Sequence, residues 1–181
     1  MKKIYTLIIL LFTIVCSAQK EGQGFCEGDI VGEYFPLTIE KKKIFWADTY
    51  YIETMEGKKI INEKTYHVFK QTWKDGNSDL LYLRKDNDAV VQYKQNTNKE
   101  VLRFNEFFNE GKSWIDTSVK GKYTVVSYAG ELLTPYCSYK NLMILKAEFE
   151  KLTFLFYYQK GYGYIGATLE GRLISYVTPE I

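Results

Sequence analysis

Apolar and polar side chains alternate over short stretches along most of the chain beyond residue 40. Successive side chains of a strand point to opposite faces, so this alternation is typical of strands that bury one face. The alternating stretches are rich in aromatic and β-branched residues and are separated by short clusters of turn residues. The predicted strands are residues 43–54, 59–73, 80–84, 89–93, 122–128, 139–148, 152–158, 164–168 and 173–177.

Tight turns are predicted at Asp-Gly-Asn (75–77) and Asp-Asn-Asp (86–88), because Gly and Asn tolerate positive φ. A kink is expected at Asn62, within the second predicted strand. Residues 101–114 fit either a short amphipathic helix or an irregular crossing. About nine or ten strands with short connections predict an all-β fold, either an antiparallel β-sandwich or an open barrel. A curved sheet of the lipocalin or LolA kind is one form of that prediction, with little helix beyond a signal peptide.

The N-terminus has the layout of a secretory signal peptide. Lys2 and Lys3 precede an apolar run over residues 4–15, and the small residues Cys-Ser-Ala at 16–18 follow. About twelve apolar residues are too few to span a bilayer stably. We therefore expect cleavage after Ala18, an exported protein in the periplasm or the medium, and a single domain over residues 19–181 with no transmembrane span.

Cys16 raises an alternative, in which an acylated cysteine becomes the N-terminus of a lipoprotein. That processing requires a small residue just before the cysteine and usually Leu three residues before it. Val15 and Thr13 occupy those two positions, so the sequence favours ordinary signal cleavage over a lipid anchor.

Charge and size narrow the functional classes. Removing residues 1–18 removes two of the 24 basic residues and none of the 22 acidic residues, which leaves a mature chain without formal net charge. No net field exists to attract nucleic acid or anionic lipid. A mature length of roughly 160 residues fits one domain with a substantial core.

Two cysteines, Cys26 and Cys137, remain after cleavage. An oxidising compartment and an even count predict a disulfide between them, with two unpaired buried thiols as the alternative. His67 is the only histidine, which argues against a zinc site. The sequence thus predicts no metal and no cofactor.

The motifs that could carry catalysis have simpler structural explanations. The Gly-x-Gly-x-x-Gly match between Gly161 and Gly166 is followed by a strand-like segment, whereas a dinucleotide site requires a helix there. His67 has no adjacent nucleophile or orienting acid. Glu148 and Glu150 share one strand face but are flanked by lysines, as on an exposed charged edge. We therefore expect a protein that is not an enzyme.

The aromatic residues are the best candidates for a binding role. The chain has 16 tyrosines and 3 tryptophans. The pairs Tyr50-Tyr51 and Tyr157-Tyr158 each place one ring on either face of a strand. One set of rings must meet the core, and the other could form a ligand or partner surface. The candidates for lining a ligand groove are Trp46, Tyr50, Tyr157 and Tyr158.

In the C-terminal third, Thr-Pro at 134–135 leads into the predicted strand at 139–146, and an aromatic strand and a glycine-rich turn follow at 157–165. In these segments the chain resembles the TapB-like family of exported bacterial β proteins. Tyr-Phe-Pro-Leu at 34–37 is similar to that family's opening segment, before its first Trp/Tyr strand. The resemblance implies an exported all-β domain of poorly defined function and supplies no catalytic residues.

The chain departs from that family at two places. Tyr136 and Cys137 replace the small pair after Thr-Pro, and Tyr162 replaces a branched residue between the two glycines. The first departure places a cysteine in a turn, which suits pairing with Cys26.

Three functional hypotheses follow. The first is a non-catalytic binding module that uses a curved sheet and aromatic residues to hold an apolar ligand, an envelope protein or a glycan. The second is a periplasmic carrier that encloses a lipid or other apolar ligand in a cavity lined by alternate residues of most strands. The third is a glycan-active hydrolase, which requires a cleft with convergent carboxylates.

Overall fold

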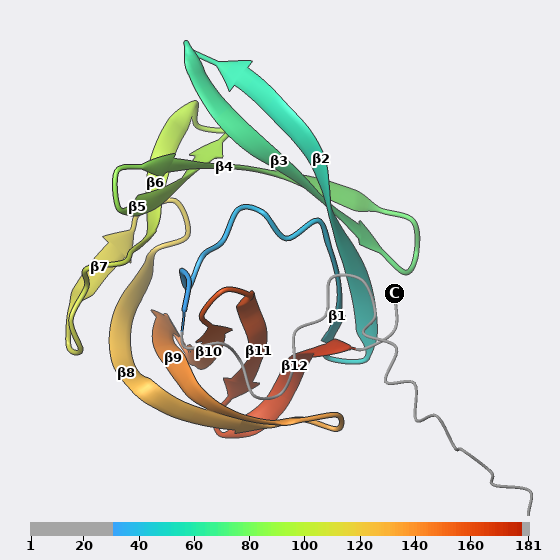
Figure 1. Ribbon diagram of the computed structural model, residues 1–181, viewed down its shortest axis with the longest axis vertical. Coiled ribbons are helices and arrows are strands. Elements are labelled where there is room, and N and C mark those ends of the chain that lie inside the picture. The colour runs from blue at the N-terminus through green and yellow to red at the C-terminus, as the bar shows by residue number, and fades with distance from the viewer. Residues whose placement is uncertain (1–30, 179–181) are drawn as a thin grey trace, which may run out of the picture.

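The computed structural model describes residues 31–178, which form one antiparallel sheet of twelve strands (Figure 1). The signal peptide prediction for residues 1–18 and the predicted cysteine partner Cys26 lie outside these residues. No helix in the described part of the chain could span a lipid bilayer. The strands are β1 Lys41–Trp46, β2 Thr49–Ile61, β3 Lys64–Trp73, β4 Ser78–Asp86, β5 Ala89–Lys94, β6 Lys99–Asn105, β7 Ser113–Asp116, β8 Gly121–Leu133, β9 Ser138–Phe149, β10 Leu152–Gln159, β11 Gly163–Leu169 and β12 Arg172–Thr178.

The sheet is a meander that curls round on itself. Its order is β6-β5-β4-β3-β2-β1-β12-β11-β10-β9-β8-β7, so β12 pairs with β1 and the two sheet edges are β6 and β7. In Figure 1 the strands curl around the segment that precedes β1. The sheet has a seam between β6 and β7, because these two edge strands are not hydrogen-bonded to each other. The all-β prediction is confirmed in its open-barrel form.

Two predicted strands are in fact hairpins. Residues 43–54 contain the end of β1 and the start of β2, joined by a turn in which Ala47 has a φ of 53°. At Asn62 and Glu63, with φ of 48° and 63°, the chain reverses completely between β2 and β3. The sequence prediction missed the reversal at 47–48, and at 62–63 it placed a kink where the chain turns without making it a complete reversal. Neither turn has the Gly or Pro that marks a turn most strongly.

The ambiguous segment 101–114 holds the open seam. It contains most of β6, the start of β7 and a connecting loop, so the short-helix alternative is wrong and the irregular crossing describes only the loop at 106–112. The ring of Phe108, in the loop, lies 5.0 Å from that of Trp114 and 6.0 Å from that of Phe104, measured between centroids. Aromatic packing therefore covers this gap in the hydrogen-bonded sheet.

The segment that precedes β1, residues 31–40, runs inside the curved sheet (Figure 1). The ring of Phe35 is stacked on Tyr158 of β10 and on Phe104 of β6, with centroid distances of 4.5 Å and 5.1 Å. Tyr34 is buried beside the same rings. This inner segment therefore joins two strands that lie far apart in the sheet order.

Hydrogen bonds fix the inner segment at both of its sides. The Glu106 carboxylate, in the β6–β7 loop, accepts hydrogen bonds from the backbone amides of Tyr34 (3.1 Å) and Phe35 (3.3 Å). The Gly161 amide, in the β10–β11 turn, donates to the Glu33 carbonyl (2.8 Å). A polar backbone that crosses an apolar interior needs such partners, because unpaired buried amides are costly.

Candidate functional site

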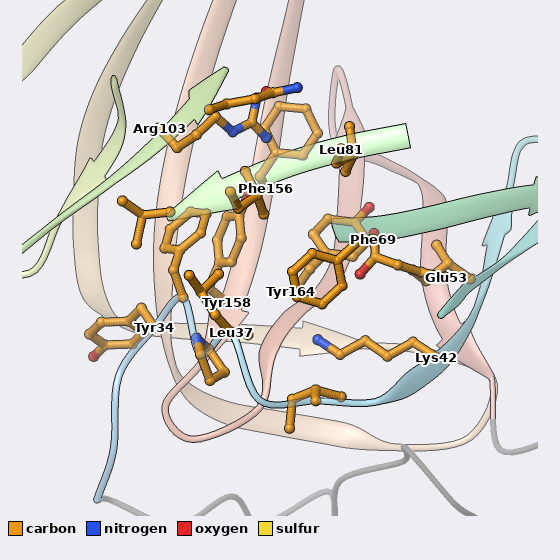
Figure 2. Close-up of a pocket in the computed structure, with 18 of the residues that line it drawn as sticks. Tyr34, Leu37, Lys42, Glu53, Phe69, Leu81, Arg103, Phe156, Tyr158 and Tyr164 are labelled. Carbon is orange, nitrogen blue, oxygen red and sulfur yellow. The ribbon is translucent and has the colours of Figure 1, made fainter. Parts of the chain in front are cut away.

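A cavity of about 290 Å³ lies between the concave face of the sheet and the inner segment (Figure 2). Several strands each contribute lining residues spaced two positions apart, because side chains at that spacing lie on the same face of the sheet. Examples are Ile44 and Trp46 of β1, Phe69 and Gln71 of β3, and Leu81 and Leu83 of β4. The cavity is thus the inside of the curled sheet, and most of the strands contribute to it.

One part of the wall is apolar. Figure 2 shows Phe69, Leu81 and Phe156, from β3, β4 and β10, together with Leu37 of the inner segment. Residue types of this kind provide contact area for hydrocarbon groups without requiring hydrogen bonds.

Lys42 brings a buried amine into this interior. Its side chain extends from β1 toward the labelled lining residues (Figure 2) and donates a hydrogen bond to the Tyr162 carbonyl at 2.5 Å. The amine also lies 4.4 Å from the centroid of the Tyr162 ring. Burial lowers the pKa of Lys42 to about 8, against the opposing effect of the nearby Glu53 charge. The amine is therefore mainly protonated at neutral pH.

The two acids of the cavity wall each have a protein partner. Glu53 of β2 lies directly across from Gln71 of β3 and accepts a 2.7 Å hydrogen bond from its amide nitrogen. Asp116, at the end of β7, accepts hydrogen bonds from the backbone amide and the hydroxyl of Ser118. Each carboxylate has further acceptor positions beyond these hydrogen bonds.

Arg103 of β6 enters the cavity wall through a β-bulge. Leu102 pairs with Val91 and Phe104 pairs with Val90, which leaves Arg103 as the extra residue between them. A bulge of this kind changes the direction of a side chain, and bulges are common beside functional sites. The bulge thus places a guanidinium among the lining residues, in the region that Figure 2 shows above Phe156.

Five tyrosines also line the cavity, one of them Tyr34 of the inner segment. Tyr164 donates to the Ser175 hydroxyl at 2.7 Å. The hydroxyls of Tyr51, Tyr123 and Tyr158 have no hydrogen-bond partner within residues 31–178. Burial raises the pKa of Tyr158 to about 12 and raises those of Tyr51 and Tyr123 as well. These phenols stay protonated at neutral pH and can each donate a hydrogen bond.

Two of the four aromatic residues predicted for a ligand groove lie on the cavity wall. Trp46 and Tyr158 line the cavity, from β1 and β10 respectively. Tyr50 does not line it, and its ring lies instead under the amine of Lys43, 4.7 Å from its centroid.

Tyr157 is also absent from the cavity wall. It is buried in a cluster with Leu132, Tyr139 and Leu142, which come from the distal part of the β8–β9 hairpin. The β8–β9 pairing shifts register three times, and bulges of this kind bend a strand. Tyr157 therefore meets this hairpin, while its neighbour Tyr158 meets the cavity.

Lys42, Glu53 and Arg103 are cavity residues that the sequence prediction did not identify. Lys42 and Glu53 have a usable signal, because they stand two residues from the apolar Ile44 and Tyr51 and so share the buried face. Arg103 has no such signal, since a bulge breaks the alternation that would place its side chain.

Cys137 lies in the β8–β9 turn. Its amide donates to the Thr134 hydroxyl at 3.0 Å, and its carbonyl accepts from the Thr134 amide at 2.9 Å. The disulfide with Cys26 stays a prediction, because Cys26 lies outside the described residues. No group of three or more His, Cys, Asp or Glu side chains within residues 31–178 is placed to hold a metal ion.

Comparison with known proteins gives a distant structural similarity. No protein-family model matches the chain, and no curated protein matches it. The TapB-like resemblance therefore stays a prediction. A crystal structure of a protein assigned as exported, with a YmcC-like fold, from Bacteroides fragilis is similar at a TM-score of 0.45 and 12% sequence identity. The similarity covers 82% of this chain and 97% of that one.

Proposed function

We propose that this protein is exported and binds a small amphipathic molecule, without catalysis, in the cavity inside its curved sheet. The observation that carries this proposal is the composition of the cavity wall. One part is made of apolar side chains such as Phe69 and Leu81, and another part holds Arg103 and tyrosine hydroxyls without a protein partner. A wall of this kind is complementary to a molecule with an apolar body and a polar group.

The position of the cavity favours a carrier over a module that binds through an outer aromatic surface. A carrier requires an interior space lined by alternate residues of most strands, and the 290 Å³ cavity has this lining. Its size is near the lower end of the range for small-molecule sites, roughly 300–1,000 Å³. Export is supported by the signal-peptide pattern of residues 1–18.

The test is native mass spectrometry of the mature protein isolated gently from its own host. We expect an added mass that denaturation releases as one amphipathic compound. Trp46 supplies a second readout, because its indole lines the cavity and its fluorescence should change when the compound is added back.

Leu81 and Leu80 supply a matched pair of variants. Leu81 lines the cavity, whereas Leu80, the preceding residue of β4, has 45% of its surface exposed. Leu81→Trp should fill the cavity and remove the added mass, and Leu80→Trp should leave it unchanged. A bare mass in the wild type, with no Trp46 response to apolar probes, would contradict the proposal.

A further inference from the structure

Arg103 has no hydrogen-bond or ion-pair partner in the part of the chain that the structure describes. The other arginine of the β4–β6 region, Arg84, shows the usual arrangement. Its guanidinium bonds both carboxylate oxygens of Glu100, at 2.5 Å and 3.0 Å. A partly buried guanidinium that lines a cavity carries a cost unless its donors are satisfied. The donors of Arg103 are therefore available to water or to a ligand that enters the cavity.

The bulge at Arg103 adds to this cost. An ordinary register would continue the β5–β6 hydrogen-bond ladder, whereas the extra residue interrupts it between Val90 and Val91. The visible effect of the bulge is that it places the Arg103 side chain in the cavity wall. The free energy lost with the interrupted β5–β6 hydrogen bonds is offset if the guanidinium binds a ligand in the cavity.

Other unpaired donors share this cavity. Gln92 of β5 is 5% exposed and lines the cavity, and its side chain makes no hydrogen bond within residues 31–178. The Tyr51 and Tyr158 hydroxyls are also without partners there. The pKa of each tyrosine is raised mainly by burial. The Glu53 charge adds to both rises and the Arg103 charge partly opposes them, so both charges lie near the two hydroxyls. The Arg103, Gln92, Tyr51 and Tyr158 side chains form a group of donors that no acceptor within residues 31–178 engages.

The charges of the cavity point in the same direction. The carboxylates of Glu53 and Asp116 already accept hydrogen bonds from Gln71 and Ser118. The Lys42 amine donates to the Tyr162 carbonyl. Arg103 is thus the one charged lining residue whose side chain makes no hydrogen bond or ion pair within residues 31–178. Guanidinium is well suited to bidentate binding of carboxylate or phosphate.

We infer that the ligand is an anionic amphiphile whose oxyanion headgroup binds Arg103, an assignment that rests on the proposed function. The Tyr51 and Tyr158 hydroxyls and the Gln92 amide donate to the same headgroup. The hydrocarbon part lies against Phe69, Leu81 and Phe156. A free fatty acid and a lipid phosphate would both supply this chemistry.

The test compares decanoate, decyl phosphate and decanol, which share one chain length and differ in the headgroup. Binding of each to delipidated mature protein is measured by isothermal titration calorimetry and by Trp46 emission. We expect at least one of the two anions to bind wild type about tenfold or more tightly than decanol. The anion that binds more tightly identifies the carboxylate or the phosphate as the natural headgroup.

Arg103→Met should remove the preference for the anion and leave decanol binding within about twofold of wild type. Arg172→Met is the matched control, because Arg172 is exposed and lies outside the cavity wall. This variant should keep the preference. Arg103→Gln serves as a second variant if circular dichroism shows that the methionine variant is unfolded.

The failures of the two proposals are distinguishable. Equal binding of anions and decanol by wild type, or an unchanged anion preference in a folded Arg103 variant, would overturn the inference and leave the proposed function standing. Absence of binding for all three compounds, together with a bare native mass, would overturn the proposed function itself.

Discussion

The rings of Phe104 and Trp114 lie 6.5 Å apart across the seam between β6 and β7. These strands are the two edges of the sheet and are consecutive in the chain. Phe104 is fully buried and also contacts the rings of Tyr34 and Phe35 in the inner segment. Side-chain packing at one residue thus covers a sheet edge and holds the inner segment against it. Unpaired edges that are not covered promote edge-to-edge association.

Phe104→Ala should lower the free energy of unfolding by about 3–5 kcal/mol, because it removes a fully buried ring from this packing. Urea denaturation followed by far-UV circular dichroism measures the change. Phe107→Ala is the control, since 75% of the Phe107 surface is exposed and its loss should cost less than about 0.5 kcal/mol. Similar costs for the two variants would show that the seam does not depend on Phe104.

The sequence predicts the local part of this fold well. Alternation identifies strands, and the turns at 75–77 and 86–88 are marked by Gly and Asn, so most hairpins follow from neighbouring residues. The pairing of β1 with β12 joins residues about 130 positions apart, as in Phe45 with Tyr176. No short-range pattern specifies such a contact, which is why the sequence left sandwich and open barrel as alternatives.

The site is predicted less completely than the fold. Trp46 and Tyr158 were chosen as aromatic residues of predicted strands, and both lie on the cavity wall. Tyr157 has the same local pattern but meets the β8–β9 hairpin, a contact set by register shifts that the sequence does not reveal. Arg103 depends on a bulge, so its direction follows from backbone geometry and not from residue type.

Glu106 should control whether the inner segment stays in place. Glu106→Ala removes the acceptor for the Tyr34 and Phe35 amides and should cost about 1–3 kcal/mol of stability. Hydrogen exchange at those two amides should accelerate more than exchange in β2 or β3, because the loss is local. Mass spectrometry of peptides that cover the inner segment measures the effect.

Glu150→Ala is the control for this experiment, because Glu150 is exposed in the β9–β10 turn. Its removal should leave exchange in the inner segment unchanged. Glu106→Gln keeps one side-chain acceptor and should fall between wild type and the alanine variant. Unchanged exchange at Tyr34 and Phe35 in the alanine variant would show that ring stacking alone holds the segment.

Lys42 should make the free energy of unfolding depend on pH in the alkaline range. Its pKa falls from 10.5 to about 8 on folding, mainly through burial, so the folded state binds fewer protons than the unfolded chain between those values. Rising pH therefore stabilises the fold through this group, by about 3 kcal/mol across the window. The difference in unfolding free energy between wild type and Lys42→Met, measured from pH 7 to pH 10, isolates this contribution.

The control is Lys43→Met, because Lys43 is adjacent in β1 and lies over the ring of Tyr50, outside the cavity. The stabilisation that Lys42 supplies at alkaline pH should persist in this variant. A direct check is NMR titration of the Lys42 side chain, which should give a midpoint near pH 8. A midpoint above pH 10 would mean that the amine is not desolvated in the folded protein.

Glu100 should make the free energy of unfolding depend on pH in the acidic range. Its carboxylate bonds Arg84, Lys64 (2.7 Å) and Tyr66 (2.7 Å), and the Arg84 hydrogen bond is the largest cause that lowers its pKa to about 2. The folded state therefore binds fewer protons than the unfolded chain between pH 4.5 and about 2, and this stabilising contribution is lost as pH falls through that range. Glu100→Gln should cost about 1–2 kcal/mol of unfolding free energy at pH 7. It should also flatten the acid limb of a plot of urea midpoint against pH.

Glu148→Gln is the control, since it breaks an exposed ion pair with Lys146 and should cost less than about 1 kcal/mol. An acid limb that is as steep in Glu100→Gln as in wild type would assign the acid sensitivity to other carboxylates.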